Sequence, residues 1–91
     1  MTMQNRPYAV MVEPAARRVL NKLPRQIQVR IISRIESLSA NPRPPGAIKL
    51  SGHDAYRIRV GDYRVVYSVI DTQLLVIVVT VGNRRDVYRD Y

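Results

Sequence analysis

The sequence predicts an α+β fold with the element order β-α-α-β-β-β, in which an antiparallel sheet is packed on one face by a two-helix hairpin. Two observations predict it. Apolar residues follow a helical period over residues 14–38, whereas β-branched residues dominate residues 47–81. The chain has 91 residues and no linker-like stretch, so we expect one domain spanning residues 1–91.

The first strand is expected over residues 7–12 (PYAVMV), a β-branched and aromatic segment. The first helix follows, with Pro14 as its first residue, where the missing N–H of proline costs nothing. Pro24 then interrupts the pattern and can open a second helix, which ends before the proline-rich residues 41–46. Its apolar stripe recurs at three- and four-residue steps: Ile27, Ile31, Ile35 and Leu38. The solvent-facing side of this helix carries Arg25, Arg30 and Arg34.

The remaining segment predicts a three-stranded meander with turns at Gly61-Asp62 and Asp71-Thr72. The first is a good two-residue turn because glycine tolerates positive φ, and the second is poorer and can be a longer loop. A two-residue turn at Gly61-Asp62 pairs Arg59 with Arg64 across the strands, and paired residues share a face. The opposite face would then face the helices: Tyr56, Ile58, Val60, Tyr63, Val65, Tyr67 and Val69.

Arg57, Arg59 and Arg64 therefore share one face of the predicted hairpin. Arg59 opposite Arg64 is a like-charge pair, which costs a few tenths to about 1 kcal/mol. One interpretation is that all three side chains fan into solvent. We favour an anion-binding site, because a sheet selected for stability alone would avoid this pair.

The third strand of the meander is apolar on both faces and is expected to be central in the sheet. A two-residue turn before it would place Arg64 opposite Val79 and Val66 opposite Ile77. The chain's own C-terminus, a partner protein or a second copy would then cover an apolar strip on the arginine face. This strip consists of Leu75, Ile77 and Val79.

The C-terminal segment carries Arg84 and Arg85 after the strand end that lies nearest the arginine face. Tyr88 lies four residues after Arg84, so one helical turn would point both side chains the same way. A frayed basic terminus is an equally good interpretation.

The net charge is +8, which favours an anionic partner such as nucleic acid or an acidic protein. Of the fifteen basic residues only Lys22 and Lys49 are lysine. Arginine suits planar, bidentate contact with phosphate, although a GC-rich genome also favours arginine. The chain lacks cysteine, a signal-peptide core and a spanning apolar run, so we expect a cytoplasmic protein without membrane contact.

No metal-ligand pattern, nucleotide-binding motif or catalytic triad is present, and His53 is the single histidine. No cofactor is therefore expected. Converging arginines suit a phosphodiester, because they stabilise the negative charge that builds on phosphorus. RNA supplies its own nucleophile, the 2′-OH, and a tyrosine among arginines is a better base because the positive field favours its phenolate. The pattern fits a metal-independent ribonuclease and equally fits simple binding.

Two stretches, KLSGHDAYRIRVGDYRVVYSVID and VIVVTVGNRRDVYRDY, resemble the RelE/ParE toxin superfamily of toxin–antitoxin modules. The resemblance implies a RelE-like fold and a RelB-like antitoxin as partner, with operator DNA bound only through the antitoxin complex. In RelE-type members it also implies ribosome-dependent cleavage of mRNA in the A site by 2′-OH attack, which inhibits translation.

Residue by residue, the resemblance implies that Arg64, Arg84 and Tyr88 are catalytic. It also implies that Arg57, Arg59 and Arg85 bind RNA phosphate, and that the strip at Leu75, Ile77 and Val79 contacts the antitoxin. Arg57 and Arg59 stand where the family has lysines. Because arginine does not deprotonate, Tyr88 remains the best candidate for the base.

Two alternatives remain open. A ParE-like toxin would act on DNA gyrase without cutting RNA, and the retained Arg84 and Tyr88 argue against it. A degenerate module would bind its antitoxin without any activity of its own.

Overall fold

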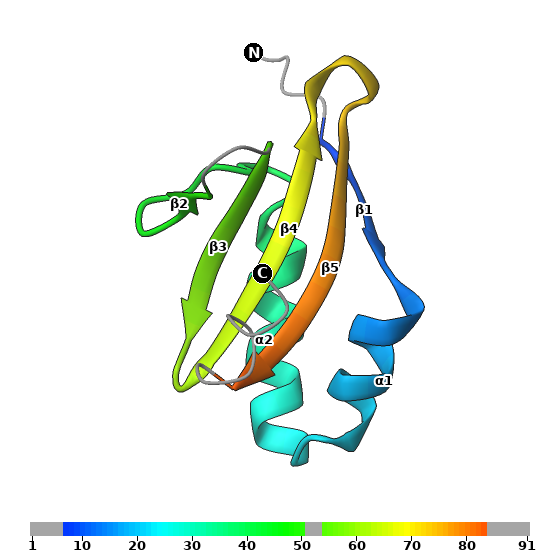
Figure 1. The fold of residues 1–91 in the computed structure, drawn as a ribbon, viewed down its shortest axis with the longest axis vertical. Coiled ribbons are helices and arrows are strands. Elements are labelled where there is room, and N and C mark those ends of the chain that lie inside the picture. Colours follow the sequence, from blue (N-terminus) through cyan, green and yellow to red (C-terminus); the bar gives the residue numbers. More distant parts are fainter. Residues whose placement is uncertain (1–6, 51–53, 84–91) are drawn as a thin grey trace.

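The computed structural model describes residues 7–50 and 54–83. It contains a five-stranded sheet with the strand order β1-β5-β4-β3-β2 (Figure 1). The helices are α1 (Pro14–Lys22) and α2 (Arg25–Ser37), and a 3₁₀ turn spans Asp71–Gln73. The strands are β1 (Ala9–Val12), β2 (Ile48–Lys49), β3 (Ala55–Val60), β4 (Tyr63–Ile70) and β5 (Leu75–Asn83).

The α+β prediction is confirmed, with two differences in the sheet. β1 runs parallel to β5, with Ala9 opposite Leu75 and Val12 opposite Val78, while the other neighbours are antiparallel. Parallel neighbours need a long connection, which the helices and the β3–β4 hairpin supply here. The two-residue β2 is an additional edge strand beside β3.

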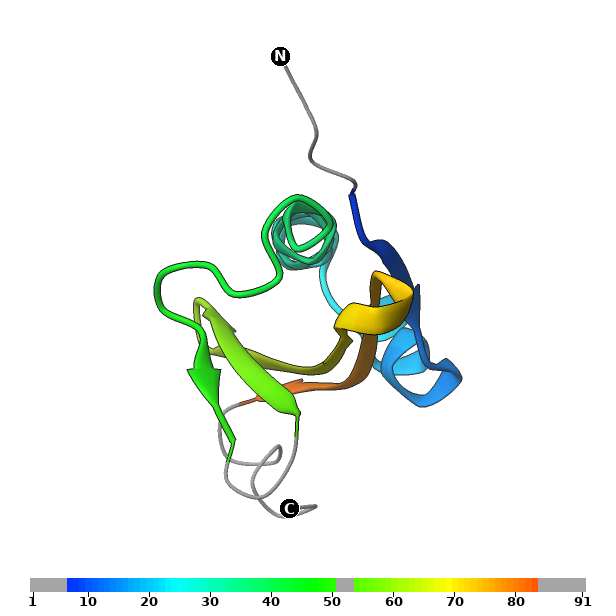
Figure 2. The same ribbon diagram turned by 90° about the horizontal axis from the view of Figure 1, so that it is seen from above.

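The helices begin and pack as their sequences predict. Pro14 is the first residue of α1, and Pro24 occupies the N-cap position of α2. Ile31, Ile35 and Leu38 are buried in one core with the inner face of the sheet. Figure 2 shows α2 lying within the curve of that sheet. In the described part of the chain, neither helix is long and apolar enough to span a bilayer.

The predicted register of the β3–β4 hairpin is confirmed. Arg59 lies opposite Arg64, and Val60 lies opposite Tyr63. Gly61 has a φ of +61°, which a glycine adopts without the steric cost that a Cβ would bring. The predicted core face is also found, since Ile58, Val60, Val65, Tyr67 and Val69 are buried there and Tyr56 and Tyr63 pack against them.

The predicted register of β4 with β5 is wrong. Arg64 pairs with Gly82 instead of Val79, and Val66 pairs with Thr80 instead of Ile77. The turn is longer than two residues, because the 3₁₀ turn is followed by Leu74 with a φ of +50°. An irregularity between Val66 and Tyr67 then leaves one extra residue, Val79, on β5. β5 is nevertheless central, as predicted, between β1 and β4.

A polar cluster fixes the loop that follows α2. Arg43 donates two hydrogen bonds to the Asp71 carboxylate, at 3.1 and 2.8 Å, and its Nε donates to the Tyr56 hydroxyl at 2.8 Å. Tyr8 also donates to Asp71, at 2.7 Å. The Tyr67 hydroxyl donates to the Pro42 carbonyl at 2.7 Å. These contacts join the loop to β3, β4 and the β4–β5 turn, and Tyr8, just before β1, bonds to the same turn.

The cluster predicts a pH-dependent loss of stability on Asp71→Asn. The hydrogen bonds from Arg43 and then from Tyr8 lower the pKa of the Asp71 carboxyl. Because the pKa of Asp71 is lower in the folded state, its charged form stabilises the fold at pH values above its unfolded-state pKa of about 4. This contribution disappears as the pH falls through the folded-state pKa. Thermal midpoints of wild type and variant should therefore differ slightly at neutral pH and converge in acid. Glu36→Gln on exposed α2 is the matched control, and an Asp71→Asn difference that persists below pH ~3 would contradict this account.

Candidate anion-binding site

The three hairpin arginines lie together on the sheet face that points away from the helices. Arg59 and Arg64 are direct cross-strand partners, and Arg57 lies two residues before Arg59 on the same strand. Their neighbours Ile58 and Val65 point to the other side, into the core. The alternation of β3 and β4 therefore concentrates three guanidinium groups on one surface.

The arginines differ in exposure. Arg57 and Arg64 are only 5% and 7% exposed, whereas Arg59 is exposed. Val66, which pairs with Arg57, is also buried on this face. The interpretation in which all three side chains fan into solvent is wrong for Arg57 and Arg64. Both have interaction partners within the chain, so they are held in place and do not sweep freely through water.

Arg57 and Arg59 line a hollow of about 350 Å³ at the edge of the sheet. A third arginine, Arg34 from the last turn of α2, lines the same hollow. Its other walls are Pro45, Gly46 and Ile48, which belong to the loop fixed by Arg43 and to β2. Arginines from a helix and a strand thus line one space of a size that admits a phosphate group.

Sequence reasoning placed Arg34 on the wet side of α2 and did not connect it with the hairpin. The available signal was its spacing of four residues from Arg30, which puts both on one helix face. That signal alone does not say which strand edge the face lies beside.

Arg64 lies opposite Gly82, so the neighbouring strand presents no side chain beside this guanidinium. β5 ends at Asn83, one residue later, which places the end of the strand at the arginine end of the sheet. Arg84, Arg85 and Tyr88 lie outside the described residues, as does His53. The roles assigned to Arg84, Arg85 and Tyr88 stay predictions.

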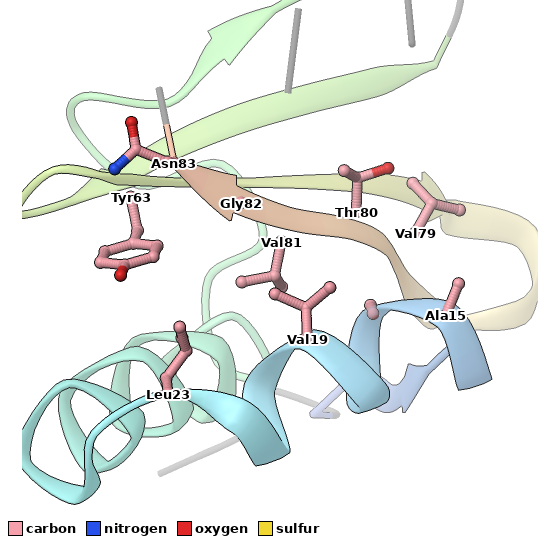
Figure 3. Close-up of a pocket in the computed structure, with 10 residues that line it drawn as sticks. Ala15, Val19, Leu23, Tyr63, Val79, Thr80, Val81, Gly82 and Asn83 are labelled. Atoms are coloured by element: carbon pink, nitrogen blue, oxygen red, sulfur yellow. The ribbon is translucent and has the colours of Figure 1, made fainter. Parts of the chain in front are cut away.

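The predicted apolar strip is only half-buried. Leu75 and Ile77 lie opposite Ile70 and Ser68, on the arginine face. Val79 occupies the extra position in β5, and its side chain points away from α1 in Figure 3. Leu75 and Ile77 therefore lie on the face of β5 that the helices leave uncovered, whereas Val79 also lines a hollow between α1 and β5.

A separate apolar hollow of about 440 Å³ lies between α1 and β5. Figure 3 shows Val19 of α1 and Leu23, the residue after that helix, on one side, with Val81 and Tyr63 projecting toward them from the sheet. Sequence analysis did not single out this hollow. It is on the helix side of the sheet and is distinct from the arginine hollow.

Two of the described tyrosines are poor candidates for a base. Burial, and then the neighbouring Tyr56, raises the pKa of Tyr67 to about 12, so this phenol stays neutral and donates to Pro42. The hydrogen bond to Asp71 raises the pKa of Tyr8. Within residues 7–50 and 54–83, no three His, Cys, Asp or Glu side chains gather in a way that could hold a metal ion.

Comparison with known proteins relates this architecture to a family. Residues 10–88 match the family model of the ParE toxin of the type II toxin–antitoxin system parDE. The chain is 40% identical over 86 residues to a protein from Escherichia coli described as a RelE-like toxin, covering 89% of this chain and 90% of that protein. It is 32% identical over 85 residues to toxin RelG of Mycobacterium tuberculosis, and the match covers 91% of this chain and 98% of RelG. A chain in the crystal structure of the toxin–antitoxin complex RelBE2 from Mycobacterium tuberculosis superimposes with a TM-score of 0.77 at 29% identity. The match covers 91% of this chain and 98% of that chain.

Proposed function

Because the chain belongs to the RelE/ParE superfamily of toxins from type II toxin–antitoxin systems, we propose that it is a ribosome-dependent endoribonuclease that cleaves mRNA in the A site. The observation that supports this proposal is the arginine face. Arg57 and Arg64 lie beside the exposed Arg59 on one sheet surface, and a group of guanidinium side chains suits the negative charge of a phosphodiester.

The proposed reaction uses the 2′-OH of the substrate as the nucleophile. Its oxygen attacks the adjacent phosphorus, a base takes its proton, and the bond between phosphorus and the 5′ oxygen breaks. The 5′ oxygen leaves with the bonding electrons and takes a proton from solvent. The products are a 2′,3′-cyclic phosphate and a 5′-OH, and no metal is required.

Each arginine has a specific role in this proposal. Arg64 and Arg84 stabilise the negative charge that develops on the phosphoryl oxygens, and Arg57, Arg59 and Arg85 bind neighbouring phosphates. Tyr88 is the proposed base, since the arginine field favours its phenolate. The high pKa of Tyr67 supports this choice by removing a described alternative.

A RelB-like antitoxin is the proposed protein partner, and operator DNA is reached only through that complex. The solved relative RelBE2 is a toxin–antitoxin complex, which supports this assignment. The half-buried strip of Leu75, Ile77 and Val79 supplies apolar area along β5 for an antitoxin segment.

A second candidate function is poisoning of DNA gyrase, because the matching family model is that of the ParE toxin. The two functions predict different damage in cells. On induction, an RNase toxin stops incorporation of labelled amino acids before any DNA breaks appear. A gyrase poison produces double-strand breaks first, and translation continues until later. Breaks that precede translation arrest would therefore contradict the ribonuclease proposal.

A further inference from the structure

The arginine hollow is one of two that meet at the outer edge of β3. The second hollow, of about 400 Å³, lies between α2 and the end of β3. Arg34 and Arg59 line both hollows, so the two spaces are neighbours on either side of these side chains. The second hollow adds Arg30, one helical turn before Arg34. A basic groove thus leads from the arginine face, around the sheet edge, to the surface of α2.

The side chains of this groove are placed to meet a ligand from solvent. Arg30, Arg34 and Arg59 are exposed, and within the described part of the chain none of them forms a salt bridge with a carboxylate. The Arg30 guanidinium reaches over the β3–β4 turn, since its Nη2 lies 3.9 Å from the position of a Cβ on Gly61. Asp62 of that turn lines a third, smaller hollow together with Arg30.

The chemistry of the groove suits the backbone of a nucleic acid. Its charged lining is arginine, whose planar guanidinium binds phosphate in a bidentate way. None of the residues that line these two hollows is aromatic, so neither hollow itself offers a platform on which bases could stack. Contacts of this kind hold and orient a strand without reading its sequence.

We propose that this groove is a second RNA-binding site, in which Arg30 and Arg34 bind phosphates of single-stranded RNA outside the cleaved linkage. The inference rests on the proposed function, because the groove opens into the arginine face where cleavage is proposed to occur. A strand held at that face and continuing past Arg59 meets Arg34 and then Arg30. This row of arginines, which starts at the face where cleavage is proposed, favours RNA over an acidic protein as the ligand.

The test is a salt titration of RNA binding with the full-length chain. The probe is a fluorescent oligouridine with 2′-O-methyl groups, which lacks the nucleophile and cannot be cut. The variant is Arg30→Ala/Arg34→Ala. The matched control is Arg17→Ala/Arg18→Ala, which removes the same charge from exposed positions on α1. The slope of log affinity against log salt is negative, and each lost phosphate contact reduces its magnitude by about 0.7. The magnitude should therefore fall by about 1.4 for the groove variant and hardly at all for the control.

Equal slopes for the groove variant and the control would overturn the inference, because the effect would then be one of net charge. It would also be overturned if the groove variant kept wild-type RNA binding but bound an acidic antitoxin more weakly. Failure of the proposed function is recognised separately. In that case Arg64→Ala would leave A-site cleavage unchanged, whatever the slope for the groove variant.

Discussion

Replacing Arg64 with alanine is expected to reduce mRNA cleavage on ribosomes by about 100-fold or more, because removing one preorganised donor to a developing oxyanion costs roughly that factor. Arg64 is the most suitable arginine for this test. It lies on a central strand, is 7% exposed and is flanked by Gly82 on the neighbouring strand. Cleavage is measured as the rate at which a ribosome-bound message loses its full-length form. Induced wild type should arrest growth, whereas the variant should not.

The controls must separate lost chemistry from lost structure, since Arg64 is buried and has partners of its own. Arg64→Lys keeps the positive charge but loses the planar guanidinium that can donate two hydrogen bonds to one phosphate. This variant should therefore retain part of the activity. Arg17→Ala removes an exposed arginine from α1 and should remain fully active. Thermal melting and antitoxin binding report whether Arg64→Ala is folded. A folded Arg64→Ala protein that cuts mRNA as fast as wild type would contradict its assigned role.

Replacing Ile31 with alanine is expected to lower the free energy of unfolding by about 2–5 kcal/mol. Ile31 is fully buried at the centre of α2, in the core that the helix shares with β3, β4 and β5. Truncation removes the transfer free energy of the lost methyl and methylene groups and leaves a cavity. A small domain has only about 5–15 kcal/mol of stability, so the variant should be close to unfolding. Urea titration followed by circular dichroism measures the change.

Ile32 provides a control of identical chemistry at the next position. It is 37% exposed on the same helix, so Ile32→Ala removes the same atoms from a site in contact with water. Its cost should be below about 1 kcal/mol. Similar losses for the two variants would contradict the assignment of Ile31, and not Ile32, to the core.

The β3–β4 hairpin was predictable from the sequence because its turn contains a residue type that selects the turn geometry. Gly61 supplies the positive φ that a two-residue turn needs, and the alternation on both strands then fixes the register. The β4–β5 turn carries no such signal. Leu74 adopts the positive φ there, a conformation that its residue type disfavours, and the extra residue Val79 is likewise invisible in the alternation of apolar residues.

Long-range arrangement was less predictable. Nothing in residues 7–12 specifies that β1 pairs in parallel with β5, because that pairing depends on how the helices return the chain. The contact between Arg43 and Asp71 joins residues 28 positions apart, which no local pattern predicts. Arg34 and Arg57 line the same hollow only because of the way α2 packs against the sheet.

The candidate site, too, was only partly predictable from the sequence. That Arg57, Arg59 and Arg64 share a face followed from local alternation, and the structure confirms that placement. That Arg57 and Arg64 are buried while Arg59 is exposed did not follow, because burial depends on every segment packed nearby.

The central claim is that the protein cuts mRNA in the ribosomal A site, and mapping the 5′ ends of ribosome-bound mRNA after induction tests it most directly. The account predicts new 5′-OH ends within A-site codons for wild type, strongly reduced ends for Arg64→Ala, and unchanged ends for Arg17→Ala. Growth arrest by wild type without A-site ends would contradict it, as would equally abundant ends from a folded Arg64→Ala protein.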